Sequence, residues 1–221
     1  MLSYHKVGHE PWDAWGTWFY TPADAFAGQL AYLEQAGWEV IGLPTFVEGI
    51  ARPDALPARA ALITFDDGYR SVREVALPVL AERRYPAVVF MPSDFIGRNN
   101  DFDAGNAPEE PLCGWDDLRE LERGGVSIES HGASHRAFSE LDAEAQELEL
   151  HRSKSTLEEG LGKTVNAIAY PYGDGGTDWG ALDGALSRLG YSAAFLLWRW
   201  SGSLPDPGPV PPTAGGGRLG Y

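Results

Sequence analysis

The chain has 221 residues, which is long enough for one domain with a large core. Its residues are 43% hydrophobic and 12% aromatic, a composition that excludes a disordered chain. The 32 acidic and 17 basic residues give a net charge of −15, which argues against nucleic acid and anionic membranes as partners. The single cysteine, Cys113, excludes an internal disulfide bond, and no apolar run approaches the roughly 20 residues of a membrane-spanning helix.

Strand and helix patterns alternate along the chain. The nearly all-apolar run at 60–65 is typical of a strand buried on both faces. Phe26, Leu30 and Leu33 share one face of a helix, and the stretch at 71–84 looks helical despite Pro78. Strands are predicted at 2–7, 38–43, 60–65, 87–91, 126–130, 167–170 and 191–197, and helices at 23–36, 71–84, 115–123, 141–159 and 179–189.

This alternation predicts an α/β fold, with a parallel sheet and helices outside it. About seven strand–helix units suit a single-domain (β/α) barrel that is closed or nearly closed. The alternative is an open doubly wound sheet, but the sequence has no nucleotide-binding fingerprint to favour it. In both folds the chemistry is expected at the carboxyl ends of the strands.

The first motif is Thr64-Phe65-Asp66-Asp67-Gly68, where an apolar strand ends and a helix is about to begin. Two adjacent carboxylates repel each other, which raises one pKa. That cost disappears if one carboxylate binds a cation while the other works as a base. The competing interpretation is a turn or a helix cap, since Asp and Gly are common in both.

The second motif, Ser130-His131-Gly132-Ala133-Ser134-His135, also follows a strand and holds two of the five histidines. Its two imidazoles can reach one metal ion if the segment forms a helical turn. The alternative is a pair of polar loop histidines. With a carboxylate from the first motif, the imidazoles make a facial ligand set that leaves positions for water and substrate.

The third motif, Ala169-Tyr170-Pro171-Tyr172-Gly173, lies at another predicted strand end. A Pro-Tyr-Gly turn can direct a backbone N–H and a tyrosine ring into the mouth of a barrel. Standing alone, this motif is better read as a plain turn.

In this order the motifs resemble the polysaccharide deacetylase family, also called the NodB homology family or family-four carbohydrate esterases. The resemblance covers roughly the first nine-tenths of the chain and implies a distorted (β/α) barrel acting on acetylated carbohydrate. It also implies that Asp67, His131 and His135 bind a divalent metal, usually zinc. Asp66 would be the general base, and the backbone N–H of Tyr172 would help to stabilise the oxyanion.

Two departures from the family pattern point to a subgroup. Many members have arginine where this chain has Ala169, and many have a catalytic histidine near the C-terminus, whereas no histidine follows His151 here. The chain is most similar to the poly-N-acetylglucosamine deacetylases, which lack that arginine and place the acid in an N-terminal Tyr-His motif. Here that residue is His5, with His9 as the alternative.

The implied reaction is hydrolysis of an N-acetyl group. The metal lowers the pKa of water, Asp66 accepts a proton, and His5 protonates the departing amine. Two alternatives stay open, an esterase that removes O-acetyl groups and a carbohydrate-binding protein that has lost turnover.

The two ends of the chain carry further expectations. Residues 1–7 lack the apolar region of a secretory signal, so we expect a cytoplasmic protein, although a trimmed secreted chain would look the same. We expect the deacetylase domain to span 1–197, with an irregular Pro/Gly-rich tail over 198–221. A frame error in the gene would also explain this tail, since codons for Trp-Arg-Trp can encode Gly-Gly in another frame.

Overall fold

The computed structural model describes residues 1–8 and 19–196. His9, the expected domain boundary at 197 and the tail at 198–221 therefore lie outside the described residues. Within the described residues, no helix has the length and apolarity needed to span a bilayer.

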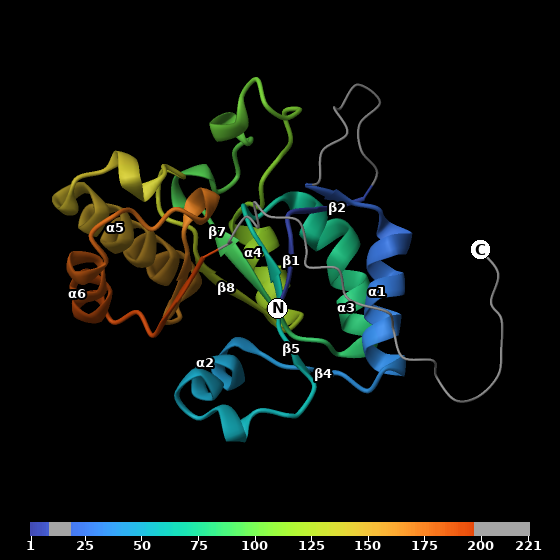
Figure 1. The fold of residues 1–221 in the computed structure, drawn as a ribbon. Coiled ribbons are helices and arrows are strands. Elements are labelled where there is room, and N and C mark those ends of the chain that lie inside the picture. The colour runs from blue at the N-terminus through green and yellow to red at the C-terminus, as the bar shows by residue number, and fades with distance from the viewer. Residues whose placement is uncertain (9–18, 197–221) are drawn as a thin grey trace, which may run out of the picture.

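Strands and helices alternate as the sequence predicts (Figure 1). The strands are β1 (Leu2–Tyr4), β2 (Lys6–Val7), β3 (Tyr20–Thr21), β4 (Glu39–Val40), β5 (Ala60–Ala61), β6 (Ile63–Phe65), β7 (Ala87–Met91), β8 (Val126–Ser130), β9 (Ala167–Ala169) and β10 (Ala193–Phe195). The helices are α1 (Ala23–Gln35), α2 (Leu43–Ala51), α3 (Leu77–Arg83), α4 (Trp115–Arg123), α5 (Ala143–Leu161) and α6 (Trp179–Leu189).

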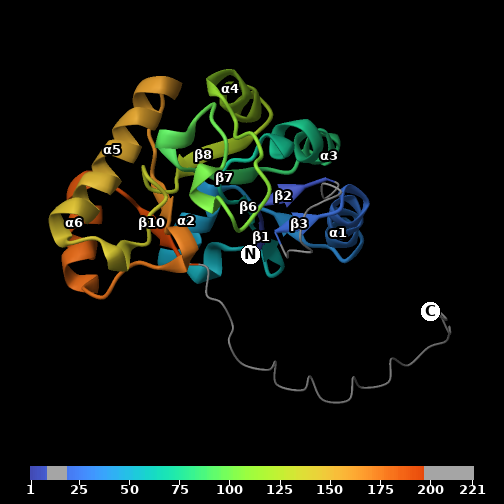
Figure 2. The same cartoon turned by 90° about the horizontal axis from the view of Figure 1, so that it is seen from above.

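Within residues 1–8 and 19–196, the central sheet has six strands in the order β1-β6-β7-β8-β9-β10. All its pairings are parallel, and two further parallel pairs, β2-β3 and β4-β5, lie outside it. Seen from above, α1, α3, α4, α5 and α6 follow one another in an arc around the strands (Figure 2). The distorted (β/α) barrel is therefore confirmed, with six strands in its main sheet where the sequence suggested about seven.

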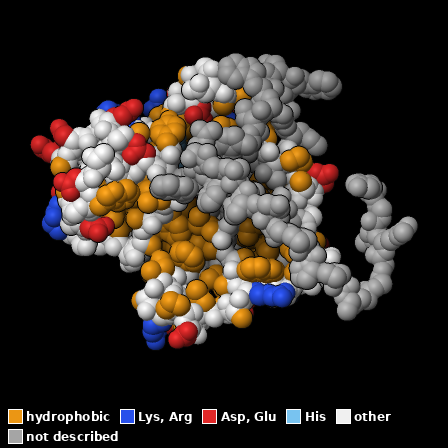
Figure 3. Space-filling view, in the orientation of Figure 1, with side chains coloured by type: hydrophobic (Ala, Val, Ile, Leu, Met, Phe, Trp, Pro, Cys, Tyr) orange, Lys and Arg blue, Asp and Glu red, His pale blue; other side chains and the backbone are white. Residues whose placement is uncertain are grey.

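Both faces of the sheet are covered, which explains its apolar strands. In β7 all five residues are buried. Ala87, Val89 and Met91 pack into the core on one face, while Val88 and Phe90 belong to a second cluster on the other face, as the two-residue period of a strand requires. Side chains of α2 pack against this second cluster, and Figure 3 shows hydrophobic side chains gathered above α2.

Four expected elements differ from the structure. The strand expected at 60–65 is divided into β5, which pairs with β4, and β6, which belongs to the central sheet. The strand expected at 38–43 is wrong from Ile41 onward, because Leu43 begins α2, with a proline in its first turn. The helix expected at 71–84 is a π-helical stretch, Val72–Ala76, followed by α3, whose first turn contains Pro78 and so lacks one backbone donor. The strand expected at 2–7 is broken at His5 into β1 and β2.

Candidate active site

The sequence motifs follow the carboxyl ends of parallel strands. Asp66 and Asp67 come after β6, His131 after β8, and Tyr170 after β9. His5 follows β1, the neighbour of β6 in the sheet. Because all these strands are parallel, their carboxyl ends lie at one edge of the sheet, where barrels of this kind carry their chemistry.

Asp67, His131 and His135 form a buried cluster at this edge. Their ligand atoms all lie within 4.8 Å of one another. The Oδ1 atom of Asp67 lies 3.3 Å from Nε2 of His131 and 3.0 Å from Nε2 of His135. Three acceptor lone pairs that face one another need a proton or a cation between them. This donor set of one carboxylate and two imidazoles is able to bind a divalent metal ion.

In each imidazole, Nε2 faces Asp67 and Nδ1 has a separate partner. Nδ1 of His131 lies 2.7 Å from the carbonyl oxygen of Ala169, which can only accept, so Nδ1 carries the hydrogen and Nε2 stays free as a ligand atom. Nδ1 of His135 lies 3.2 Å from the hydroxyl of Tyr172. The two rings are therefore held in orientations that suit a metal site.

The segment between the two histidines is a loop and not the helical turn that would be one way to bring both imidazoles to a single ion. Gly132 has a φ of 74° and His135 a φ of 57°, and these left-handed positions bend the chain so that both rings still reach Asp67. Asp67 and Tyr172 also have positive φ values, of 68° and 59°. Residues without glycine's freedom rarely adopt this conformation, and such strain is concentrated at functional sites.

Asp66 and Asp67 have opposite pKa shifts. Burial raises the pKa of Asp66, and its Oδ2 atom has no hydrogen-bond partner among the described residues. Burial acts in the same direction on Asp67, but the hydrogen bonds with His131 and His135 outweigh it and hold the pKa of Asp67 well below its usual range. Asp67 is therefore suited to remain an anionic ligand, and Asp66 to accept a proton.

His5 lies beside this cluster, at the break between β1 and β2. It is 8% exposed, and its ring meets that of Phe19 edge-on at 5.0 Å between centroids. Its charge acts to lower the pKa of both Asp66 and Asp67, which places it within electrostatic reach of the two carboxylates. Position and burial are thus consistent with a proton donor, whereas its alternative, His9, is not described.

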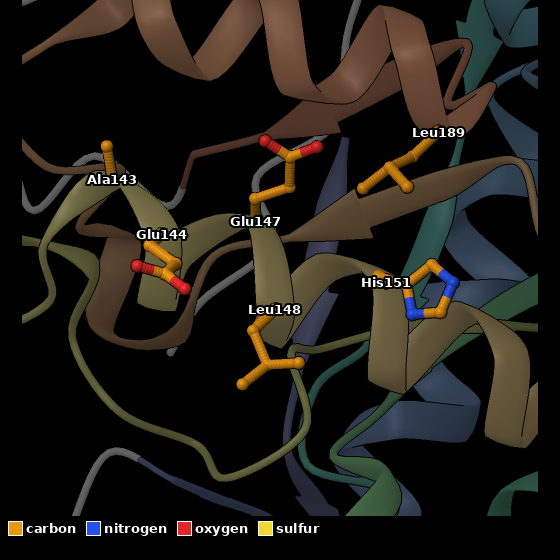
Figure 4. A pocket seen from close by; sticks show the side chains of 6 residues that line it. All are labelled: Ala143, Glu144, Glu147, Leu148, His151 and Leu189. Carbon is orange, nitrogen blue, oxygen red and sulfur yellow. The ribbon is translucent and has the colours of Figure 1, made fainter.

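His151 lies away from the cluster. It projects from α5 and is exposed, as expected for a histidine on the surface of a helix. Figure 4 shows it lining a shallow pocket with Glu144 and Glu147 of the same helix. Among the described residues, only Asp67, His131 and His135 lie close enough together to hold a metal ion, so His151 serves as a control for the histidines of the site.

The side chain of Tyr172, and not only its backbone, lies at the cluster. The residue is 59% exposed, its ring meets the ring of His135 edge-on at 4.9 Å, and its hydroxyl lies 3.2 Å from His135 Nδ1. Burial, with the charges of Asp103 and other carboxylates, raises its pKa to about 12, so the hydroxyl keeps its proton at neutral pH.

One wall of the site is formed by residues that lie outside the three sequence motifs. Phe102 stacks on His135 with 3.9 Å between ring centroids, and the neighbouring Asp103 accepts a hydrogen bond from the Tyr69 hydroxyl at 3.1 Å. Both lie in the loop between β7 and α4, and no residue pattern of that loop indicates that it folds back over a histidine. A depression of about 550 Å³ beside His135 is lined by Phe95, Asp101, Phe102, Ser134, His135, Arg136, Ala137, Glu140 and Tyr172.

Comparisons with solved structures agree with this architecture. IcaB from Ammonifex degensii superposes with a TM-score of 0.75 and 27% identity, over 88% of this chain and 82% of that one. The Streptococcus pyogenes deacetylase PplD, in complex with acetate, gives a TM-score of 0.74 over 86% of this chain and 80% of that one. At 21% identity, the likeness to PplD supports the fold alone.

Sequence comparisons find relatives that are longer than this chain. The Bacillus subtilis protein YxkH is 27% identical over 174 residues, which make up 78% of this chain and 56% of the relative. The poly-β-1,6-N-acetyl-D-glucosamine N-deacetylase of Escherichia coli is 27% identical over 135 residues, or 59% of this chain and 20% of the relative. The chain thus spans about half of one relative and a fifth of the other.

The family model for polysaccharide deacetylase matches residues 54–194, which is more than half of the chain. The match includes Asp66, Asp67, His131, His135 and Tyr172, whereas His5 lies before it. The chain therefore belongs to the polysaccharide deacetylase family.

Proposed function

We propose that this protein is a metal-dependent hydrolase that removes N-acetyl groups from poly- or oligosaccharides containing N-acetylglucosamine. The observation that carries the proposal is the division between two adjacent buried aspartates. Asp67 faces two imidazoles as a metal ligand, while Asp66 has a raised pKa and an oxygen that no described residue binds. The similarity to the Escherichia coli N-deacetylase supports the choice of substrate.

The proposed metal is zinc. Two imidazole nitrogens and one carboxylate oxygen suit zinc, and three protein ligands leave a coordination position open for chemistry. When bound, such an ion supplies Lewis-acid activation of water and of the carbonyl oxygen.

The residues around the metal group then divide the proton transfers between them. Asp66 accepts the proton of the attacking water, since its raised pKa makes it a better base than an ordinary aspartate. The backbone N–H of Tyr172 donates to the developing oxyanion. His5 donates a proton to the departing nitrogen, because an amide anion is a very poor leaving group.

The experiment that tests this function is acetate release from defined substrates. The protein is incubated with β-1,6-linked N-acetylglucosamine oligomers after removal of metal and again after addition of zinc. We expect acetate with zinc and very little without it. An O-acetylated oligosaccharide and a chitin oligomer, run in parallel, test the reacting group and the linkage.

The outcomes separate the alternative functions. Acetate from the O-acetylated substrate alone would make the protein an esterase. Binding of the oligomers without acetate release from any substrate, in protein that holds zinc, would make it a carbohydrate-binding protein without turnover. Either result would contradict the proposed N-deacetylase.

A further inference from the structure

The loop between the two histidines of the cluster is fastened to α5 by one carboxylate. Glu149, in the middle of α5, is only 8% exposed. Its Oε2 atom accepts hydrogen bonds from the backbone N–H groups of Ala133 and Ser134, both at 2.8 Å. Its Oε1 atom accepts from the Ser134 hydroxyl at 2.9 Å. One side chain therefore binds three donors of this loop.

Other bonds also hold this loop: its carbonyl groups at Gly132 and Ala133 accept from the N–H groups of Ser93 and Asp94. Glu149 is the acceptor for the N–H groups of Ala133 and Ser134. The loop is not helical, and its left-handed residues Gly132 and His135 lie on either side of the two amides that Glu149 binds. Ala133 is fully buried, so its N–H would lose a partner that water cannot replace. Hydrogen bonds to an ionised acceptor are about twice as strong as those between neutral groups.

We propose that Glu149 is a positioning residue for the metal site, which fixes the separation and orientation of His131 and His135 through the loop between them. Glu149 does not contact the cluster itself, and its effect passes through the backbone of Ala133 and Ser134. This inference rests on the proposed metal group and not on the identity of the substrate. It makes α5, which contributes no ligand, part of the structure that holds the ligands in place.

The expected consequence is a loss of metal affinity in protein that remains folded. Removing partners that orient metal ligands typically costs about 10- to 100-fold in metal affinity. We expect a loss of this size for Glu149→Ala and about tenfold for Glu149→Gln, which keeps the shape and one oxygen acceptor but not the charge. Glu149→Asp, with its shorter carboxylate, should recover part of the affinity that alanine loses.

The test measures the dissociation constants of zinc and cobalt for the full-length chain by competition with a chelator, beside thermal unfolding of the metal-free form. The absorption spectrum of the cobalt form reports ligand geometry independently of turnover, and it should change in Glu149→Ala. Glu147→Gln is the matched control, because Glu147 is exposed on the same helix and pairs with Arg188. We expect it to bind metal like the wild type.

Glu149→Gln keeps the inference falsifiable if the alanine variant does not fold. Wild-type affinity and an unchanged cobalt spectrum in folded Glu149→Gln would overturn the positioning role. Absence of metal binding by the wild type would overturn the metal assignment and this inference with it. A wild type that binds metal but releases no acetate would contradict only the proposed function, and the effect of Glu149 on affinity would still support the inference.

Discussion

Asp66 and Asp67 are neighbours in the chain, both buried at the end of β6, yet their pKa values are shifted in opposite directions. The difference comes from their partners. Asp67 lies against Nε2 of both His131 and His135, whereas Asp66 has an oxygen without a partner among the described residues. Two adjacent residues of the same type are thus suited to different roles, Asp67 to that of a ligand and Asp66 to that of a base.

Replacing Asp66 by asparagine should separate activity from metal binding. We expect Asp66→Asn to lower kcat by about two to four orders of magnitude, the usual scale for loss of a general base, while the metal content stays that of the wild type. Acetate release and elemental analysis measure the two quantities. Asp54→Asn, at an exposed aspartate, is the control. Nearly full activity in Asp66→Asn would make Asp66 a turn residue.

The same variant should be more stable than the wild type in the metal-free form at neutral pH. The raised pKa of Asp66 means that its ionised form disfavours folding, a penalty fully present above the folded pKa and relieved as the pH falls through it. Asparagine does not titrate, so the melting-temperature difference between variant and wild type should shrink as the pH is lowered toward 4. A constant difference across that range would contradict the raised pKa.

The histidines of the cluster should be required for metal retention. We expect His131→Ala to lose the metal, because two remaining protein ligands hold a divalent ion poorly. His151→Ala, at an exposed histidine of α5, should keep it. Elemental analysis after dialysis gives the metal content of each variant. Stoichiometric metal in the double variant His131→Ala/His135→Ala would disprove the ligand assignment.

Some of this molecule could be predicted from its sequence because the signals are local. The strand at 87–91 and the helix at 115–123 match the structure, since an unbroken apolar run and a glycine stop define them within the segment itself. The motifs of the site were visible for the same reason, because each directly follows a strand whose direction the fold class fixes.

Other parts depend on contacts that no local pattern records. Phe102 lies 33 positions before His135, and only the folding back of its loop brings the two rings together. Glu149 is one of many acidic residues on α5, and its burial against Ala133 is a property of helix packing. A helical turn is one way to bring His131 and His135 to a single ion, but here left-handed backbone angles achieve this convergence.

The hydroxyl and the backbone of Tyr172 can be tested separately. Tyr172→Phe keeps the N–H and the ring but loses the hydrogen bond to His135, about 1 kcal/mol for a typical bond, so kcat should fall less than about tenfold. Tyr172→Gly keeps the N–H and is compatible with the φ of 59°, and it removes the exposed ring. If Tyr172→Phe loses two to three orders of magnitude in kcat, the scale of an oxyanion donor, the hydroxyl is the catalytic group.

His5 should be required most when the leaving group is an amine. The family match begins after His5, so its role rests on its burial beside Asp66 and Asp67 and on the chemistry of amide cleavage. His5→Ala is expected to lower kcat on an N-acetylated oligomer by about two to four orders of magnitude, with unchanged metal content. The loss should be much smaller for an aryl acetate, whose phenolate leaves without protonation, and His151→Ala should affect neither substrate. Equal losses on both substrates would make His5 a structural residue, and His9→Ala would then be the variant to measure.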